Sequence, residues 1–166
     1  MSDYPWYDGS RNKVPILQFP IKLDLGAGNY SPPEHVRIDF DDSNSPEIVW
    51  NITRGIPLPD SSVCELFTSH FLEHLTPTDS HFVLQEIFRV CADGAKLTIK
   101  LPHADTPEGK LPCHYALWNE DSMRAIHQWF PHKGAKDYNG HFFDMKKVWR
   151  ESYHLIAIFE VCKGRP

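Results

Sequence analysis

The stretch from Ile21 to Gly28, IKLDLGAG, decides the fold of this chain. Its first five residues form a short apolar run that predicts a buried strand, and the glycines predict a sharp turn directly after it. Two glycines around a small residue let the backbone turn tightly and let a ligand approach without a Cβ in the way. By itself a Gly-x-Gly turn is equally consistent with an ordinary connection between strands, so the neighbouring segments must decide.

The segments that follow alternate between apolar runs and turn-rich stretches. Helix signals place Thr76 at an N-cap, Pro77 at the first helical position and Gly94 at the C-terminal stop, and they place a second helix at 120–130. Strands are predicted at 36–40, 47–51, 63–68, 96–101 and 155–161. This alternation favours an α/β fold, a Rossmann-like and mostly parallel sheet with helices on both faces.

The link between the first two strands is unusually short. Only residues 29–35 separate the glycine turn from the second strand, and two of them, Pro32 and Pro33, are prolines. A full helix does not fit there, so we expect the first crossover helix to be shortened or absent.

Length, composition and charge exclude several classes of protein. The 166 residues suffice for one domain, expected at 21–166 behind an N-terminal arm at 1–20, and 41% hydrophobic content is ordinary for a globular chain. A net charge of −5 without a concentrated Lys/Arg block argues against a nucleic-acid partner. No apolar stretch is long enough to span a membrane, and four scattered cysteines without a CxxC pair indicate a reduced, cytoplasmic protein.

Acidic residues follow the second predicted strand, at the edge where open α/β sheets bind ligands. Asp39 ends that strand, and a carboxylate there can accept two hydrogen bonds from a ribose diol. A solvated loop acid is the alternative, because Asp41 and Asp42 lie beside it. Asp24 and Asp39 are 15 positions apart (39 − 24), too close for the helix that holds a pyrophosphate in dinucleotide folds. The spacing therefore favours a nucleoside ligand without phosphates.

Several segments together resemble class I S-adenosylmethionine-dependent methyltransferases. Residues 22–28 (KLDLGAG) look like the first motif of that family, residues 56–75 (IPLPDSSVCELFTSHFLEHL) resemble the segment around its fourth strand, and residues 86–102 (EIFRVCADGAKLTIKLP) resemble the following helix and fifth strand. The short first link, and residues 113–122 (CHYALWNEDS), are similar to a compact branch of the type 11 group. The resemblance implies S-adenosylmethionine as the cofactor and methyl transfer to a small-molecule or saccharide acceptor.

The resemblance also implies which residues bind the cofactor. The glycine turn would lie against the amino-acid part, Asp39 would hold the ribose, and the residues after the fourth strand would line the pocket under the sulfonium. The implied residues are Asp24, Gly26, Ala27, Gly28, Asp39, Asn51, Ser69 and His70.

Two positions depart from the family pattern. Asn51 would sit beside the adenine, where the family usually has an acid; its carbonyl oxygen can still accept a hydrogen bond, without charge. Tyr30 stands where fuller motifs have a third glycine.

Methyl transfer from a sulfonium is an in-line displacement, so the protein mainly supplies alignment and desolvation. A general base is needed only if the acceptor must lose a proton early, and histidine is its usual source. We prefer His114, in the loop expected to meet the acceptor, followed by His103; His70 and His74 are further candidates. The histidines and cysteines of this half show no zinc-finger or HExxH spacing, so no metal site is expected.

Two alternatives to a methyltransferase stay open. One is a catalytically inactive S-adenosylmethionine-binding or scaffold module with the same fold, which Asn51, Tyr30 and the short chain favour. The other is an enzyme that cleaves the cofactor. Cofactor binding without turnover on any acceptor would favour the first, and cofactor consumption without an acceptor would favour the second. The aromatic loops of so small a domain also suggest a homodimer.

Overall fold

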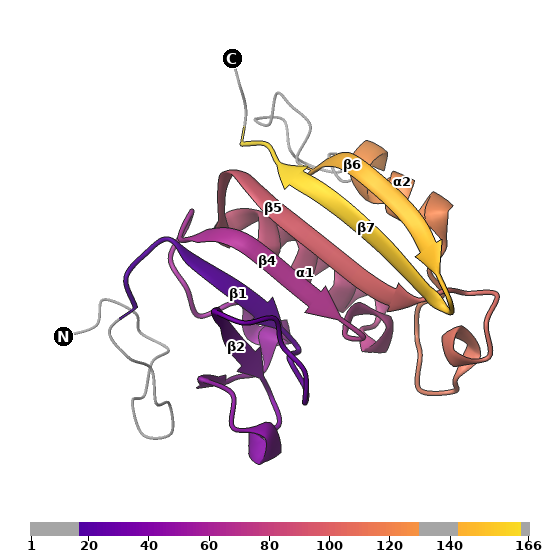
Figure 1. Ribbon diagram of the computed structural model, residues 1–166, viewed down its shortest axis with the longest axis horizontal. Helices are drawn as coiled ribbons and strands as arrows, with labels where there is room; N and C mark the ends of the chain where they lie inside the picture. The colour runs from indigo at the N-terminus through magenta and orange to yellow at the C-terminus, as the bar shows by residue number, and fades with distance from the viewer. Residues whose placement is uncertain (1–16, 130–142, 164–166) are drawn as a thin grey trace.

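The computed structural model describes residues 17–129 and 143–163, which form one seven-stranded sheet with two α-helices (Figure 1). Residues 1–16 of the expected N-terminal arm, and Phe130 at the end of the second predicted helix, lie outside the described residues. The strands run in the order β3-β2-β1-β4-β5-β7-β6. The predicted α/β class is confirmed.

Five strands pair in parallel and two are antiparallel. The strands are β1 (Ile21–Leu25), β2 (His35–Asp39), β3 (Ile48–Val49), β4 (Val63–Ser69), β5 (Cys91–Pro102), β6 (Phe143–Glu151) and β7 (His154–Val161). Strand β7 is antiparallel to both β5 and β6, whereas all pairs among β1 to β5 are parallel. The carboxyl ends of β1 to β5 therefore meet at one edge of the sheet.

Strand β6 has no counterpart among the predicted elements. Its pairing with β7 shifts between Met145 and Lys147, so two residues of β6 pass one of β7 and the alternation of side chains breaks. A strand with an interrupted period of two does not give a clear signal in sequence.

Helix α1 (Pro77–Val90) begins as predicted, since the Thr76 hydroxyl accepts a hydrogen bond from Asp79 N. Its predicted end at Gly94 is wrong. The helix stops at Val90 and β5 starts immediately, with Gly94 (φ +77°) inside an irregular stretch of that strand. Val63 of β4 pairs with Cys91 of β5, and Glu65 pairs with Lys96, so β5 advances five residues while β4 advances two. The glycine accommodates this bulge.

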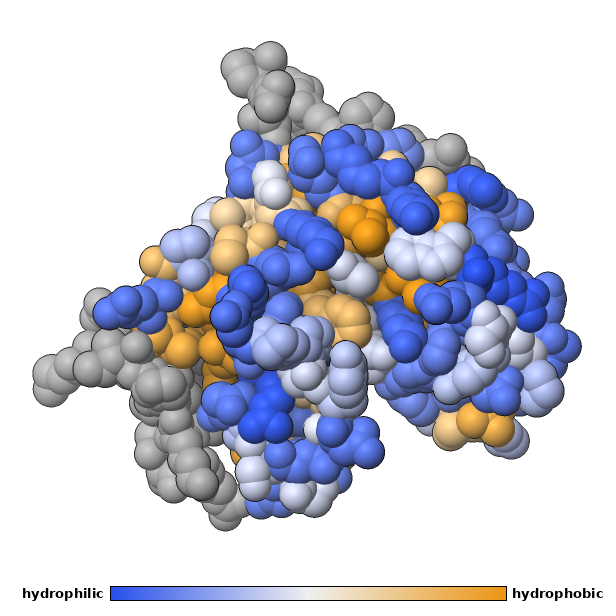
Figure 2. All heavy atoms as spheres, viewed as in Figure 1, coloured by the Kyte–Doolittle hydropathy of each residue, from blue (hydrophilic) through white to orange (hydrophobic). Residues whose placement is uncertain are grey.

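Both α-helices cover the same face of the sheet. Helix α2 (Glu120–Trp129) lies beside α1, behind the sheet in Figure 1, and the two line a common groove. In β5, Leu97 and Ile99 are buried in the core, whereas Lys96 and Thr98, which alternate with them, are more exposed. Figure 2 shows the opposite face, where hydrophilic and hydrophobic side chains are mixed. Helices were predicted on both faces of the sheet. In the described residues, both α-helices lie on one face.

The one-sided arrangement follows from the connections. The link between β1 and β2 contains no helix, as predicted, and the next two links contain only the 3-10 turns at Asp42–Asn44 and Ile52–Arg54. Only the crossovers after β4 and β5 carry α-helices, and these pack on one face.

Arg89 fastens the segment before β4 to helix α1. Its guanidinium donates to the carbonyls of Ile56 and Leu58 and to the carboxylates of Glu86 and Asp60, at 2.7–2.9 Å. Its side chain is 30% exposed. Arg89 thus supplies a donor to the Leu58 carbonyl and adds a second donor to the Ile56 carbonyl, which also accepts from Leu58 N at 2.8 Å.

We expect Arg89→Met to lower the free energy of unfolding by about 2 kcal/mol, because it leaves the Leu58 carbonyl without a donor and removes the cation beside the Glu86 carboxylate, which is 15% exposed. Arg124→Met is the matched control: among the residues that the structure describes, Arg124 pairs with exposed Asp121 on α2, and its loss should cost less than about 0.5 kcal/mol. Urea unfolding measures both. Equal losses in the two variants would contradict the anchoring role.

Candidate functional site

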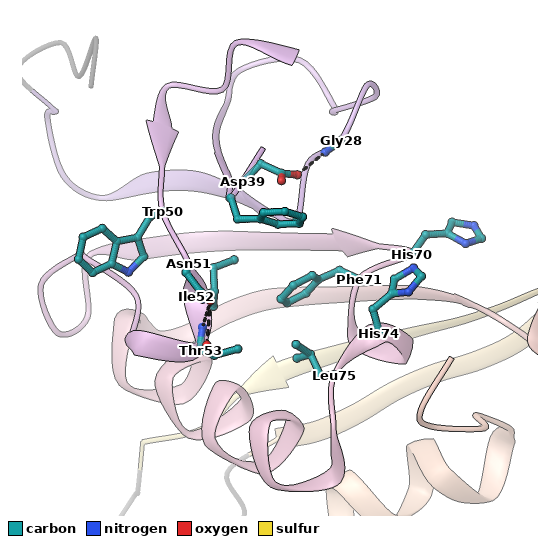
Figure 3. A pocket seen from close by; sticks show the side chains of 12 residues that line it. Gly28, Asp39, Trp50, Asn51, Ile52, Thr53, His70, Phe71, His74 and Leu75 are labelled. Carbon is teal, nitrogen blue, oxygen red and sulfur yellow. Dashed lines mark hydrogen bonds between the residues drawn. The ribbon is translucent and has the colours of Figure 1, made fainter. Parts of the chain in front are cut away.

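A cavity of about 550 Å³ opens at the carboxyl ends of β1, β2 and β4, within the usual size range for small-ligand sites. Figure 3 shows side chains from opposite sides of the cavity, among them Ile52, Phe71 and Leu75, turned toward one another. The lining comes from the segments that follow four strands: Gly26, Gly28, Asp39, Phe40, Trp50, Asn51, Ile52, Thr53, His70, Phe71, His74 and Leu75.

The glycine turn forms one wall and requires both glycines. Gly26 has φ +65°, and a Cβ there would lie 2.6 Å from the ring of Phe71. Gly28 has φ +50° and open space where a side chain would project. The first glycine is therefore required by packing, and the second leaves space beside the turn for a ligand to approach.

Asp39 holds this turn against the end of β2 (Figure 3). Its Oδ2 accepts a hydrogen bond from Gly28 N at 2.8 Å, and its Oδ1 accepts one from Asp41 N at 3.0 Å. The residue is 8% exposed and lines the cavity. Each oxygen keeps a second lone pair, so the carboxylate can still accept two hydrogen bonds from a diol.

Asn51 and Phe40 lie on the side of the cavity after β2 and β3. The Asn51 carbonyl oxygen already accepts from the backbone N and the hydroxyl of Thr53, at 3.0 and 2.8 Å. Its amide nitrogen is therefore the group left to meet a ligand. Phe40 is 77% exposed, although it is a large aromatic residue at a cavity. Phe40 is not among the residues predicted from the sequence, although an aromatic residue between Asp39 and Asp41, at the end of a strand, is a usable signal.

His70 forms a close pair with a buried carboxylate. Its Nδ1 lies 3.3 Å from Oε1 of Glu73, whose side chain is 1% exposed, whereas that of His70 is 39% exposed. His70 also has φ +52°, a left-handed backbone that is uncommon for such a residue and concentrates at functional sites. The contact is one of ion-pair distance, since neither carboxylate oxygen of Glu73 has a hydrogen-bond partner in the described segments.

Three of the predicted cofactor residues do not line the cavity. Ala27 is 6% exposed within the turn, and Ser69 ends β4 just before His70. Asp24 is 1% exposed, and neither of its carboxylate oxygens has a hydrogen-bond partner in the described segments. Burial raises the pKa of Asp24 to about 6, against smaller opposing effects of Ser31 and His35.

The two preferred base candidates lie outside the cavity lining. His103 is 4% exposed; its Nδ1 accepts from Asp105 N at 3.1 Å, so its Nε2 carries the proton and donates to Glu120 at 3.1 Å. Both ring nitrogens are engaged, which favours a positioning role. The ring of His114 packs edge-on against that of His74, 4.8 Å between centroids, and His74 itself lines the cavity.

Comparison with solved structures finds the same fold. The chain is similar to a SAM dependent methyltransferase from Aquifex aeolicus, at 16% identity and TM-score 0.62, over 85% of this chain and 81% of that one. It is similar to a putative type 11 methyltransferase from Sulfolobus solfataricus, at 15% identity and TM-score 0.59, over 88% and 86%.

A third similar structure carries ligands. This is 1,6-didemethyltoxoflavin-N1-methyltransferase from Burkholderia thailandensis with bound 1,6-didemethyltoxoflavin and S-adenosylhomocysteine, at 14% identity and TM-score 0.61, over 86% of this chain and 71% of that one. No protein-family model and no curated protein sequence matches the chain. The predicted resemblance is thus confirmed at the level of fold. No helix in the described segments is long and apolar enough to cross a membrane.

The unpaired carboxyl of Asp24 gives a pH-dependent prediction. Its folded pKa of about 6 lies above the usual value near 4, so the folded state holds the extra proton and loses stability as pH rises between those values. Relative to wild type, Asp24→Asn should therefore gain about 2–3 kcal/mol in free energy of unfolding between pH 4 and pH 7. Urea titrations across this range measure the difference, and a constant difference would contradict it.

Proposed function

We propose that this chain is an S-adenosylmethionine-dependent methyltransferase that acts on a small-molecule or saccharide acceptor. The observation that carries the proposal is the convergence of the Gly26–Gly28 turn, Asp39 and exposed Phe40 on one cavity at the carboxyl edge of a methyltransferase-type sheet. One structural neighbour is named as a methyltransferase with bound S-adenosylhomocysteine, which supports the same class of cofactor.

The residues present fit a nucleoside ligand. Asp39 would accept the two ribose hydroxyls, Phe40 would stack on the adenine, and the amide nitrogen of Asn51 would donate to a ring nitrogen. The open approach at Gly28 would admit the amino-acid part. When bound, S-adenosylmethionine would supply a methyl group on a sulfonium, already activated for displacement. The chain's own task is then to align an acceptor and to exclude water.

His70 is the general base that the contacts favour, ahead of His114 and His103. Glu73 would hold the Nδ1 proton of His70 and orient the ring, so that Nε2 can take a proton from the acceptor. The ring of Tyr153, 37% exposed, lies 6.2 Å from that of His70, and such an aromatic surface suits a sugar or ring acceptor.

The alternatives differ in what they predict for the same cavity. An inactive module would bind the cofactor and transfer nothing, and a cofactor-cleaving enzyme would consume it without an acceptor. The His70–Glu73 contact supports catalysis, because it places a carboxylate beside an exposed imidazole at the cavity. All four cysteines are free, which fits a reducing compartment such as the cytoplasm.

Calorimetric titration with S-adenosylmethionine, and separately with S-adenosylhomocysteine, tests the cofactor site. We expect micromolar binding by the wild type. Asp39→Ala and Phe40→Ala should each weaken it about tenfold or more, the former by losing ribose hydrogen bonds and the latter by losing a stacking surface. Asp42→Ala, which removes a neighbouring acid outside the cavity lining, is the control and should bind as wild type. No binding of either ligand by the folded wild type would overturn the proposal.

The base assignment is tested once an acceptor screen with radiolabelled S-adenosylmethionine gives a turnover signal. His70→Asn should lower kcat roughly 100-fold while cofactor affinity changes little, as expected when a proton acceptor is lost. Glu73→Gln should lower kcat less, because it removes the negative charge beside the imidazole but keeps a side chain of similar shape. His103→Asn is the comparison, and a kcat loss confined to it would refute the role of His70.

A further inference from the structure

Three ligating side chains from two distant segments meet beside the cavity. The ligand atoms of His74, Cys113 and His114 all lie within 4.8 Å of one another. His74 follows β4, and the other two belong to the loop after β5, 39 positions further along. The expectation of no metal site rests on local spacing, which cannot detect a cluster assembled in this way.

Backbone hydrogen bonds fix the two segments against each other. The carbonyl of Glu73 accepts from Tyr115 N at 2.9 Å and from Ala116 N at 3.4 Å. Nδ1 of His74 lies 3.4 Å from the carbonyl oxygen of Cys113. These hydrogen bonds hold the three side chains near one another, which reduces the entropic cost of gathering them around an ion.

The hydrogen bonding of the two imidazoles leaves nitrogens available for an ion. Nδ1 of His114 is buried and has no hydrogen-bond partner in the described segments. The contact of His74 Nδ1 with a backbone carbonyl is the usual arrangement of a metal-binding histidine, in which one nitrogen donates to a carbonyl and the other binds the ion. An ion bound at His114 would explain why its Nδ1 has no hydrogen-bond partner in the described segments.

The donor set selects the class of ion. Two imidazoles and one thiolate suit zinc and its cobalt substitute, whereas magnesium and calcium require oxygen ligands. A site with three protein ligands keeps a fourth position for water or another molecule. His74 and Cys113 are exposed, so that position can be reached from solvent.

We propose that His74, Cys113 and His114 bind one zinc-class divalent ion at the rim of the cavity. The ion would fasten the loop after β5 to the turn after β4, and it would leave one coordination position open beside His74, which lines the cavity. This inference does not depend on the proposed cofactor, because the ion is bound by side chains that can be tested without any nucleoside.

Titration of the metal-free chain with Co²⁺ tests the site. Thiolate-to-cobalt charge-transfer absorption should saturate at one ion per chain and should be displaced by Zn²⁺. Cys113→Ser should abolish that absorption. His114→Gln should weaken binding by more than the roughly 10–100-fold that loss of an outer-shell partner costs. Cys64→Ser removes another exposed cysteine, on β4, and should leave both readouts unchanged.

Two results would overturn the metal site: absence of charge-transfer absorption in the wild type, or absorption that Cys64→Ser removes and Cys113→Ser does not. Circular dichroism of each variant establishes that it is folded. Because the readout uses no S-adenosylmethionine, failure of the metal site and failure of the proposed function are distinguished.

Discussion

The hydrogen bond from Gly28 N to Asp39 Oδ2, 2.8 Å long, is the interaction on which the cavity depends. The link between β1 and β2 contains no helix, so no packed crossover fixes the glycine turn. One carboxylate does this instead: it holds the turn through one oxygen and the segment after β2 through the other. Asp39 is thus part of the architecture and, in our proposal, also the group that accepts the ribose. Its removal is expected to affect both roles, and for this reason Phe40, which has no structural role of that kind, is the more specific probe of the cavity.

The sequence correctly predicted those elements whose bounds are set by neighbouring residues. Thr76 and Pro77 start helix α1 where a cap and a fixed φ place the start, and the apolar run before Gly26 is a strand with the predicted bounds. Gly94 misled the prediction because a glycine suits a helix end and a strand bulge equally well, and the pairing of β5 with β4 selects the bulge. Strand β6 was not predicted because a register shift interrupts its alternation.

The residues of the site divide in the same way, into those that the local sequence predicts and those whose roles depend on distant contacts. Gly28, Asp39, Asn51 and His70 follow strands in sequence, and the parallel sheet brings them to one cavity. The roles of individual histidines depended on partners far away in the chain: Glu120 engages His103, and the segment at Glu73 meets the loop carrying His114. Contacts between residues so far apart in the chain cannot be predicted from the spacing of residues in the sequence. The pairing of His70 with Glu73 is local, three residues apart, but its importance appears only with the burial of the carboxylate.

A crystal structure of the chain with S-adenosylhomocysteine tests the central claim most directly. We expect the nucleoside in the carboxyl-edge cavity, with the ribose hydroxyls on Asp39 and the adenine against Phe40. The sulfur should face the side of the cavity where His70 lies. A nucleoside bound elsewhere on the chain, or a ribose that makes no contact with Asp39, would contradict the account.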